Sequence, residues 1–217
     1  MIVVFRNFFR NKMVNLTAKS VRHFIPNAEI YCFSFYKKDP SEYDTQEPLD
    51  PLIEEFRIQT KYVSSNSVTD HIDSTKTSGF QNADNVKYFV EGYNVIVERL
   101  KHIREKVLIL GEDHFFTTGA VINELLDNEF DLAYAPWDSH DDANGSVICL
   151  KPSEVNHLFP IPENGPCIEA HLRNQLVLRV PNNYKIKHRQ HANYFGDGKY
   201  TNSSVEIEQE LKKANII

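Results

Sequence analysis

The sequence lacks several features that would place it quickly in a class. Its three cysteines form no CxxC pair, which argues against a cysteine-based zinc site. No apolar run approaches the roughly 18 residues that a membrane-spanning helix needs, and the start has no signal-peptide pattern. A net charge of −6 disfavours non-specific nucleic-acid binding through a basic face. We therefore expect a cytoplasmic protein, without membrane insertion and without a nucleic-acid partner.

Four signature motifs of common enzyme classes are also absent. The chain has no HExxH, GxSxG, GxGxxG or GxxxxGK[ST], so the zincin, α/β-hydrolase, Rossmann dinucleotide and P-loop classes lack their signatures. What is present is ordinary for a globular protein: 217 residues, of which 41% are hydrophobic and 25% are charged. Residues 1–217 are expected to form a single domain with a sizeable core. Cys32 and Cys149 lie in apolar runs, which favours core thiols in a reducing compartment.

Strand-like apolar runs alternate with helical periodicity along the chain. The predicted strands are Met1–Phe5, Glu29–Phe35, Ile58–Val63, Lys106–Leu110, Asp131–Ala135, Ser146–Leu150 and Tyr184–His188. The predicted helices are Lys12–Ile25 capped by Asn11, residues 86–100 capped by Asp84 or Asn85, Ala120–Glu129, Ile168–Leu178 and a C-terminal helix capped by Ser203. This alternation predicts an α/β domain with a mostly parallel, mixed central sheet flanked by helices.

Ligands of open α/β sheets bind beyond the carboxyl ends of the strands, so the residues after each strand are candidates for a site. Arg6, Asn7 and Arg10 follow the first strand and could bind a phosphate and a base. The structural alternative is that both arginines are solvated and the intervening Phe8 and Phe9 belong to the core.

The strand Lys106–Leu110 is followed by Gly111, Glu112 and Asp113. Acids at the end of a buried strand can present oxygen ligands to Mg²⁺ or Mn²⁺, which usually bridge carboxylates to substrate phosphates. A surface turn with unpaired acids is the alternative. It is weakened here because the five preceding residues are typical of a fully buried central strand.

Several residues later in the chain are weaker candidates. Asp138 follows the only tryptophan and could accept a sugar hydroxyl, although a core Trp beside a turn fits equally. Gly145 permits close approach of a ligand or makes a hairpin-like turn. His188 or His191 could complete a metal site and Lys199 could meet a phosphate, while a lone histidine is more often structural.

Taken together and in this order, these segments resemble a nucleotide-sugar glycosyltransferase of the GT-A type, a Rossmann-like fold. The resemblance covers roughly Met1 to Tyr200. It rests on MIVVF, KVLILGEDHFFTTG, DLAYAPWD, ANGSVICLKP, ENGPCIEAHLRNQL and the late histidines. More narrowly, the chain resembles the glycosyltransferase module at the N-terminus of a large chlorella-virus protein. That likeness implies viral glycan synthesis and further catalytic modules in the same chain.

The resemblance also implies a metal site. Members of the family usually carry an Asp-x-Asp motif at the end of a central strand. Here Gly111 replaces the first acid and Asp113 keeps the second. The implied cofactor is Mn²⁺ or Mg²⁺, held by Asp113 together with His191 or His188.

The implied substrates are a UDP-sugar donor, of the UDP-glucose or UDP-rhamnose type, and a glycan acceptor. Glu169 falls where inverting members often place the catalytic base, and Asp138 is its competitor. The polar stretch Ser64–Asn85 would close over the donor and exclude water. The implied nucleotide and donor contacts are Arg6, Asn7, Arg10, Asn82, Asn85, Glu112, Asn144, Gly145 and Lys199.

Two other function classes stay open from the sequence. A metal-dependent phosphohydrolase or nucleotidyltransferase would share the strand-end acid and the histidines. However, the segment FRNFFRN has no glycine-rich phosphate loop, and phosphohydrolases usually need a denser set of His and Asp ligands. A non-catalytic nucleotide-binding module would use Trp137 and the polar stretch as a protein-binding surface.

Overall fold

The structure, a computed structural model, describes residues 1–7, 10–36, 47–60, 83–136, 143–164, 168–188 and 203–217. The strands are β1 Ile2–Asn7, β2 Glu29–Tyr36, β3 Ile53–Gln59, β4 Val107–Gly111, β5 Leu132–Pro136, β6 Ala143–Leu150 and β7 Asn183–Lys185. The helices are α1 Asn11–Phe24, α2 Ala83–Leu100, α3 Ala120–Asp127, α4 Pro152–Val155, α5 Ile168–Gln175 and α6 Ser204–Lys213, with short 3₁₀ turns η3 Asn156–Leu158 and η4 Val177–Arg179.

The strands form one seven-stranded sheet in the order β3-β2-β1-β4-β6-β5-β7. Strand β6 runs antiparallel to both of its neighbours, whereas every other pair in the sheet is parallel. The prediction of a mostly parallel, mixed α/β sheet is therefore confirmed. Because all strands except β6 point the same way, their carboxyl ends share one edge of the sheet, which we call the carboxyl edge; β1 reaches it at Asn7 and β4 at Gly111.

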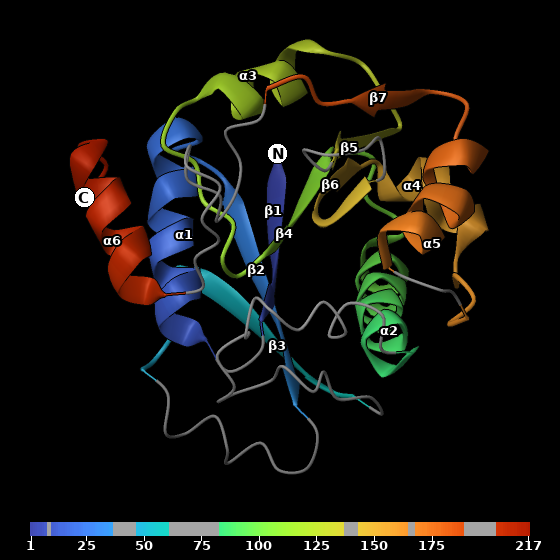
Figure 1. The fold of residues 1–217 in the computed structure, drawn as a ribbon, viewed down its shortest axis with the longest axis horizontal. Helices are drawn as coiled ribbons and strands as arrows, with labels where there is room; N and C mark the ends of the chain where they lie inside the picture. The colour runs from blue at the N-terminus through green and yellow to red at the C-terminus, as the bar shows by residue number, and fades with distance from the viewer. Residues whose placement is uncertain (8–9, 37–46, 61–82, 137–142, 165–167, 189–202) are drawn as a thin grey trace, which may run out of the picture.

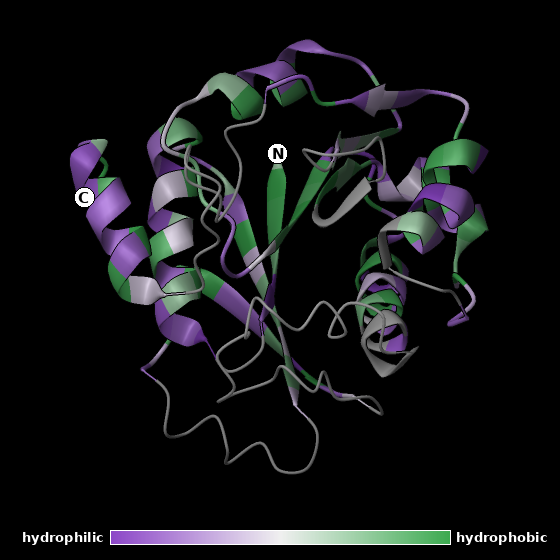
Figure 2. Cartoon of the chain, in the orientation of Figure 1, coloured by the Kyte–Doolittle hydropathy of each residue, from purple (hydrophilic) through white to green (hydrophobic). Residues whose placement is uncertain are grey.

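Helices cover both faces of the sheet. Helix α2 packs against one face through Tyr93, Ile96 and Val97, whereas α1 and α3 pack against the other. Figure 1 shows α1 and α6 on one side of the sheet and α2, α4 and α5 on the opposite side. Strands β1 and β4 lie between these layers, so Ile2–Phe5 and Val107–Leu110 are continuous apolar runs. Figure 2 shows the start of β1 as hydrophobic, whereas its last two residues, Arg6 and Asn7, are polar.

Several predicted boundaries were wrong for identifiable reasons. The third strand covers Ile53–Gln59 rather than Ile58–Val63, because an edge strand tolerates exposed charged residues that break the apolar pattern. Strand β1 extends two residues further, since the side chains of Arg6 and Asn7 are buried. Strand β7 stops at Lys185, before the predicted end at His188.

Three predicted helix caps had different outcomes. Arg10, not Asn11, is the N-cap of α1. Helix α2 begins at Ala83, so Asp84 and Asn85 lie inside it rather than before it. Ser203 is the N-cap of the C-terminal helix, as predicted.

Two further predictions concern buried cysteines and a membrane-spanning helix. Cys32 and Cys149 are free and fully buried, which confirms them as core residues. Burial raises the pKa of each thiol to about 12. Cys167 lies outside the described residues. Within the described part of the chain, no helix combines the length and the apolar character needed to cross a bilayer.

Candidate functional site

A tight turn at the end of β4 brings two acids to the carboxyl edge of the sheet. The backbone N–H of His114 donates to the carbonyl oxygen of Gly111 at 3.1 Å. This hydrogen bond closes a turn whose two central residues are Glu112 and Asp113. Asp113 is only 7% exposed, and the side chain of Glu112 is 13% exposed. The alternative of an exposed surface turn is therefore wrong.

Glu112 forms an ion pair across the β1–α1 junction. Arg10 Nη1 lies 3.5 Å from Glu112 Oε1, and Arg10 is the N-cap of helix α1. Burial raises the pKa of Glu112; the positive charge of Arg10 opposes this shift, and the neighbouring Asp113 adds to it. Two carboxyl groups close together in a poorly hydrated turn disfavour each other's ionised form, whereas a nearby positive charge favours it.

Asp113 forms a hydrogen bond with the histidine that follows it. His114 Nδ1 lies 2.8 Å from Asp113 Oδ1, and both side chains are almost fully buried. The other ring nitrogen, His114 Nε2, is buried and has no hydrogen-bond partner among the residues that the structure describes. His114 was missed as a functional candidate from the sequence, although its place next to Asp113 was the available signal.

The end of β1 supplies a buried positive charge. Arg6 is 4% exposed, and its guanidinium lies over the rings of Phe89 and Tyr93 at 4.5 and 4.8 Å from their centroids. The charge of Arg6 favours the ionised form of Glu112, so it acts at the carboxyl edge. The alternative that Arg6 is a solvated surface residue is wrong.

Asn7 connects β1 to the start of α1 and to β2. Its side-chain amide donates to Asn11 Oδ1 at 2.7 Å and to Ser34 Oγ at 3.2 Å, and its Oδ1 accepts from the backbone N–H of Arg10 at 3.0 Å. Asn11 in turn donates to the carbonyl of Glu47 at 2.9 Å. These bonds fix the backbone from which Arg10 reaches Glu112.

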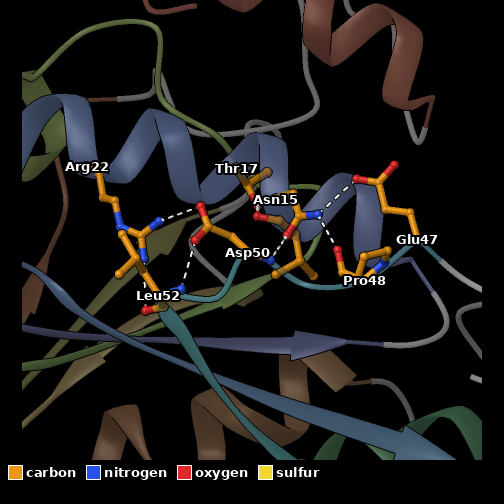
Figure 3. A network of polar contacts seen from close by, with 8 residues as sticks. Asn15, Thr17, Arg22, Glu47, Pro48, Asp50 and Leu52 are labelled. Atoms are coloured by element: carbon orange, nitrogen blue, oxygen red, sulfur yellow. Dashed lines mark hydrogen bonds and ion pairs between the residues drawn. The ribbon is translucent and has the colours of Figure 1, made fainter.

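A second set of polar contacts, shown in Figure 3, holds the segment 47–52 against α1. Asn15 donates to Glu47 Oε1 and to the carbonyl of Pro48, both at 2.9 Å, and accepts from the backbone N–H of Asp50. Arg22 completes the set by binding Asp50 Oδ2 at 3.0 Å. This network anchors the return to β3, and through the carbonyl of Glu47 it also meets Asn11, the residue bonded to Asn7 at the carboxyl edge.

His188 lies where the chain leaves β7 and is bound to a buried glutamate on α3. Glu124 accepts from Tyr184 Oη, from the backbone N–H groups of Lys187 and His188, and from His188 Nδ1 at 2.6 Å. Burial opposes ionisation of Glu124, but these hydrogen bonds together hold its pKa below the usual range. Glu124 was also missed; its signal was an acid on the buried stripe of a short amphipathic helix.

The structure brings only part of the predicted site together. Among the described residues, no group of three His, Cys, Asp or Glu side chains could hold a metal ion. Asn85 lies in α2, Asn144 and Gly145 lie in β6 rather than in a turn before it, and Glu169 lies in α5. The remaining predicted residues, which are Asn82, Asp138, His191 and Lys199, fall outside the described part of the chain, as does most of the polar stretch Ser64–Asn85. Their roles stay predictions.

Comparison with known proteins supports the fold. No protein-family model matches the chain, and no curated protein matches it. Among solved structures, the galactosyltransferase LgtC, solved in complex with donor and acceptor sugar analogues, aligns over 85% of this chain and 73% of its own, with a TM-score of 0.51 and 13% identity. The glycosyltransferase GlyE of Streptococcus pneumoniae TIGR4 aligns over 86% of this chain, with a TM-score of 0.48 and 15% identity.

This chain spans 45% of the GlyE chain. The likeness to LgtC, together with the mixed seven-stranded sheet, shows that the protein has the α/β fold of the GT-A glycosyltransferases.

Proposed function

We propose that the protein is a glycosyltransferase that moves a sugar from a UDP-sugar donor, of the UDP-glucose or UDP-rhamnose type, to a hydroxyl group of a glycan acceptor. The observation that carries the proposal is the buried Asp113 in the turn after β4, at the carboxyl edge of a GT-A sheet. Ligands of such sheets bind at this edge. The narrower resemblance to a chlorella-virus module stays a prediction.

The acids at this edge fit a hard divalent cation. Mn²⁺ and Mg²⁺ prefer carboxylate oxygens, and Glu112 and Asp113 bring two carboxylates into one poorly hydrated turn. We assign Asp113 as the principal ligand, with Glu112 beside it and with His191 or His188 as the candidate third group. When bound there, the cation supplies Lewis-acid stabilisation of the charge on the departing diphosphate, which is worth several kcal/mol.

The positive side chains are suited to the diphosphate itself. Arg10 stands at the N-terminus of α1, where the helix dipole also favours an anion, and is paired with Glu112 through a loose 3.5 Å contact. A diphosphate can replace that partner with shorter, charge-assisted hydrogen bonds. Buried Arg6 adds a fixed positive charge behind this position.

The transfer itself needs a base. The acceptor oxygen attacks the anomeric carbon of the donor, the bond from that carbon to the diphosphate oxygen breaks, and UDP leaves with the bonding electrons. A carboxylate that takes the acceptor proton contributes about 10²–10⁴ in rate. Glu169 on α5 is the candidate, with Asp138 as its competitor.

The first experiment measures UDP binding by calorimetry with and without Mn²⁺. We expect Mn²⁺ to tighten UDP binding, and we expect Asp113→Ala to abolish that gain while the variant keeps its circular dichroism spectrum. Asp127→Ala, which removes an exposed aspartate at the end of α3, is the matched control and should behave as the wild type. Equal UDP affinity with and without Mn²⁺ would argue against the metal role.

Turnover of a UDP-sugar panel against glycan acceptors then separates the function classes. Transfer of sugar with release of UDP supports the proposal. Release of inorganic phosphate without an acceptor would favour the phosphohydrolase class, and tight UDP binding without turnover of any donor would favour a binding module.

A further inference from the structure

We propose that His114 is a positioning residue, which holds the carboxylate of Asp113 in the orientation that binds the divalent cation; this inference rests on the proposed function. The geometric basis is the 2.8 Å contact between His114 Nδ1 and Asp113 Oδ1. Side-chain exposures of 4% for His114 and 10% for Asp113 leave this contact largely screened from water. A hydrogen bond in such surroundings is stronger and more directional than one at the surface.

The direction of the hydrogen bond follows from the surroundings of the ring. A carboxylate that binds a cation is ionised and can only accept a hydrogen bond, so in the cation-binding state Nδ1 must carry the proton. Nε2 is buried and has no partner among the described residues, so a proton on Nε2 would be an unsatisfied buried donor. A neutral ring therefore carries its single proton on Nδ1, where it donates to Asp113.

The backbone around this pair is fixed on both sides. The N–H of His114 closes the turn onto Gly111 at 3.1 Å. Two residues later, the N–H of Phe116 donates to Ser20 Oγ at 2.7 Å, and Ser20 Oγ donates back to the carbonyl of Phe116 at 3.1 Å. Ser20 belongs to α1, so the segment that carries Asp113 and His114 is tied to β4 at one end and to α1 at the other.

The same geometry argues that His114 is not itself a ligand of that cation. The two nitrogens of an imidazole ring point away from each other, so a ring that faces Asp113 with Nδ1 turns Nε2 away from it. One ion cannot be reached by the carboxylate and by Nε2 together, since ligand bonds are about 2.0–2.2 Å long. His114 therefore acts through Asp113, in the way that outer hydrogen bonds orient metal ligands and change metal affinity by about 10–100-fold.

The test compares three variants by Mn²⁺ titration in the presence of UDP, with free Mn²⁺ followed by electron paramagnetic resonance. His114→Asn keeps a donor near the place of Nδ1, whereas His114→Gln places its amide near Nε2 and His114→Leu has no donor. We expect His114→Leu and His114→Gln to weaken Mn²⁺ binding by about 10–100-fold, and His114→Asn to recover most of that loss. UDP affinity without Mn²⁺ should be the same in all three.

His171 offers a matched control, because it is also 3% exposed and also makes one side-chain hydrogen bond, from Nε2 to the carbonyl of Pro162 at 2.6 Å. His171→Leu should lower the unfolding midpoint but leave Mn²⁺ affinity unchanged, which separates positioning from a general packing effect.

Two results would overturn the inference: wild-type Mn²⁺ affinity in His114→Leu, or equal affinity in His114→Asn and His114→Gln. If His114→Leu does not fold, the comparison of the Asn and Gln variants decides alone. If Mn²⁺ does not change the UDP affinity of the wild type, the proposed metal role is wrong, and this inference loses its premise.

Discussion

Two carboxylate–imidazole pairs in the described part of the chain differ in their surroundings. In the first, Asp113 Oδ1 and His114 Nδ1 lie 2.8 Å apart in the turn after β4, and both side chains are buried. In the second, Glu124 Oε2 and His188 Nδ1 lie 2.6 Å apart, and the carboxylate is buried while 57% of the His188 side chain is exposed. The chemical groups are alike, so their roles must come from their neighbours and their places in the fold.

The second pair joins two distant parts of the chain. Glu124 Oε1 accepts from Tyr184 Oη at 2.8 Å and from Lys187 N at 2.7 Å, while Oε2 accepts from both the backbone and the ring of His188. With four hydrogen bonds to two oxygens, this carboxylate is suited to fixing α3 against the chain that leaves β7. The first pair joins adjacent residues in the turn that carries Glu112 at the carboxyl edge, and this position favours a role in ligand binding.

The largest expected effect comes from removing the charge of Asp113. Asp113→Asn keeps the volume of the side chain, so we expect a loss of about 10²–10³ in kcat/KM, typical of removing a preorganised electrostatic contact, together with an almost unchanged unfolding midpoint. Glu124→Gln should show the reverse, with a lower midpoint and a much smaller change in kcat/KM. Steady-state kinetics and thermal melts of the two variants measure both quantities, and similar profiles in the two variants would contradict different roles for the two pairs.

The next effect concerns stability alone. Glu124→Ala leaves the Tyr184 hydroxyl and two backbone N–H groups without their acceptor, so we expect a loss of about 2–4 kcal/mol in the free energy of unfolding. Urea unfolding followed by circular dichroism measures it. Glu129→Ala is the control, because Glu129 is exposed and its ion pair with Lys151 should contribute little. A Glu124→Ala variant as stable as wild type would contradict the structural role.

The central layer of this fold could be predicted from the sequence. Strand β4 and helix α2 were found because a buried strand reads as one apolar run and a half-buried helix repeats its apolar residues at helical spacing. Strand β3 was misplaced because three of its seven residues, Glu54, Glu55 and Arg57, are charged. Position at the edge of a sheet is a tertiary property that local pattern does not contain.

The candidate site was predictable only in part, for a related reason. A strand-end acid such as Asp113 is visible in sequence because the strand before it is visible. The contact of Glu124 with Tyr184 is not visible in the sequence, because Tyr184 lies 60 residues away and meets Glu124 only through the packing of α3 beside β7. The burial of Arg6 likewise depends on Phe89 and Tyr93 of α2, which no spacing within β1 reveals.

A smaller effect should appear in the pH dependence of stability, with opposite signs for two glutamates. The pKa of Glu124 is lowered by its hydrogen bonds, so its contribution is present above the ordinary Glu value of 4.5 and is lost as pH falls through the lower, folded value. The pKa of Glu112 is raised by burial, so its contribution is present below 4.5 and is lost as pH rises through the folded value.

Urea unfolding of the wild type, Glu124→Gln and Glu112→Gln between pH 3 and pH 7 measures these signs. Glu124→Gln should lose less stability than the wild type on acidification, and Glu112→Gln should lose less than the wild type as the pH rises. Parallel curves for all three proteins would show that neither glutamate has a different pKa in the folded state.

The smallest expected effect separates two roles of His188, a structural hydrogen bond to Glu124 and ligation of the cation. If the ring only binds Glu124, His188→Ala removes one hydrogen bond and should cost about 0.5–1.5 kcal/mol of unfolding free energy, with no change in Mn²⁺ affinity. Tyr184→Phe is the matched control, because it removes a different donor to the same carboxylate and Tyr184 is not a candidate metal ligand. A fall in Mn²⁺ affinity in His188→Ala but not in Tyr184→Phe would assign His188 to the metal site, because a histidine that donates from Nδ1 to a carboxylate is oriented to ligate through Nε2. That outcome would make Glu124 a support for the metal site, and the division between a structural pair and a ligand-binding pair would no longer hold.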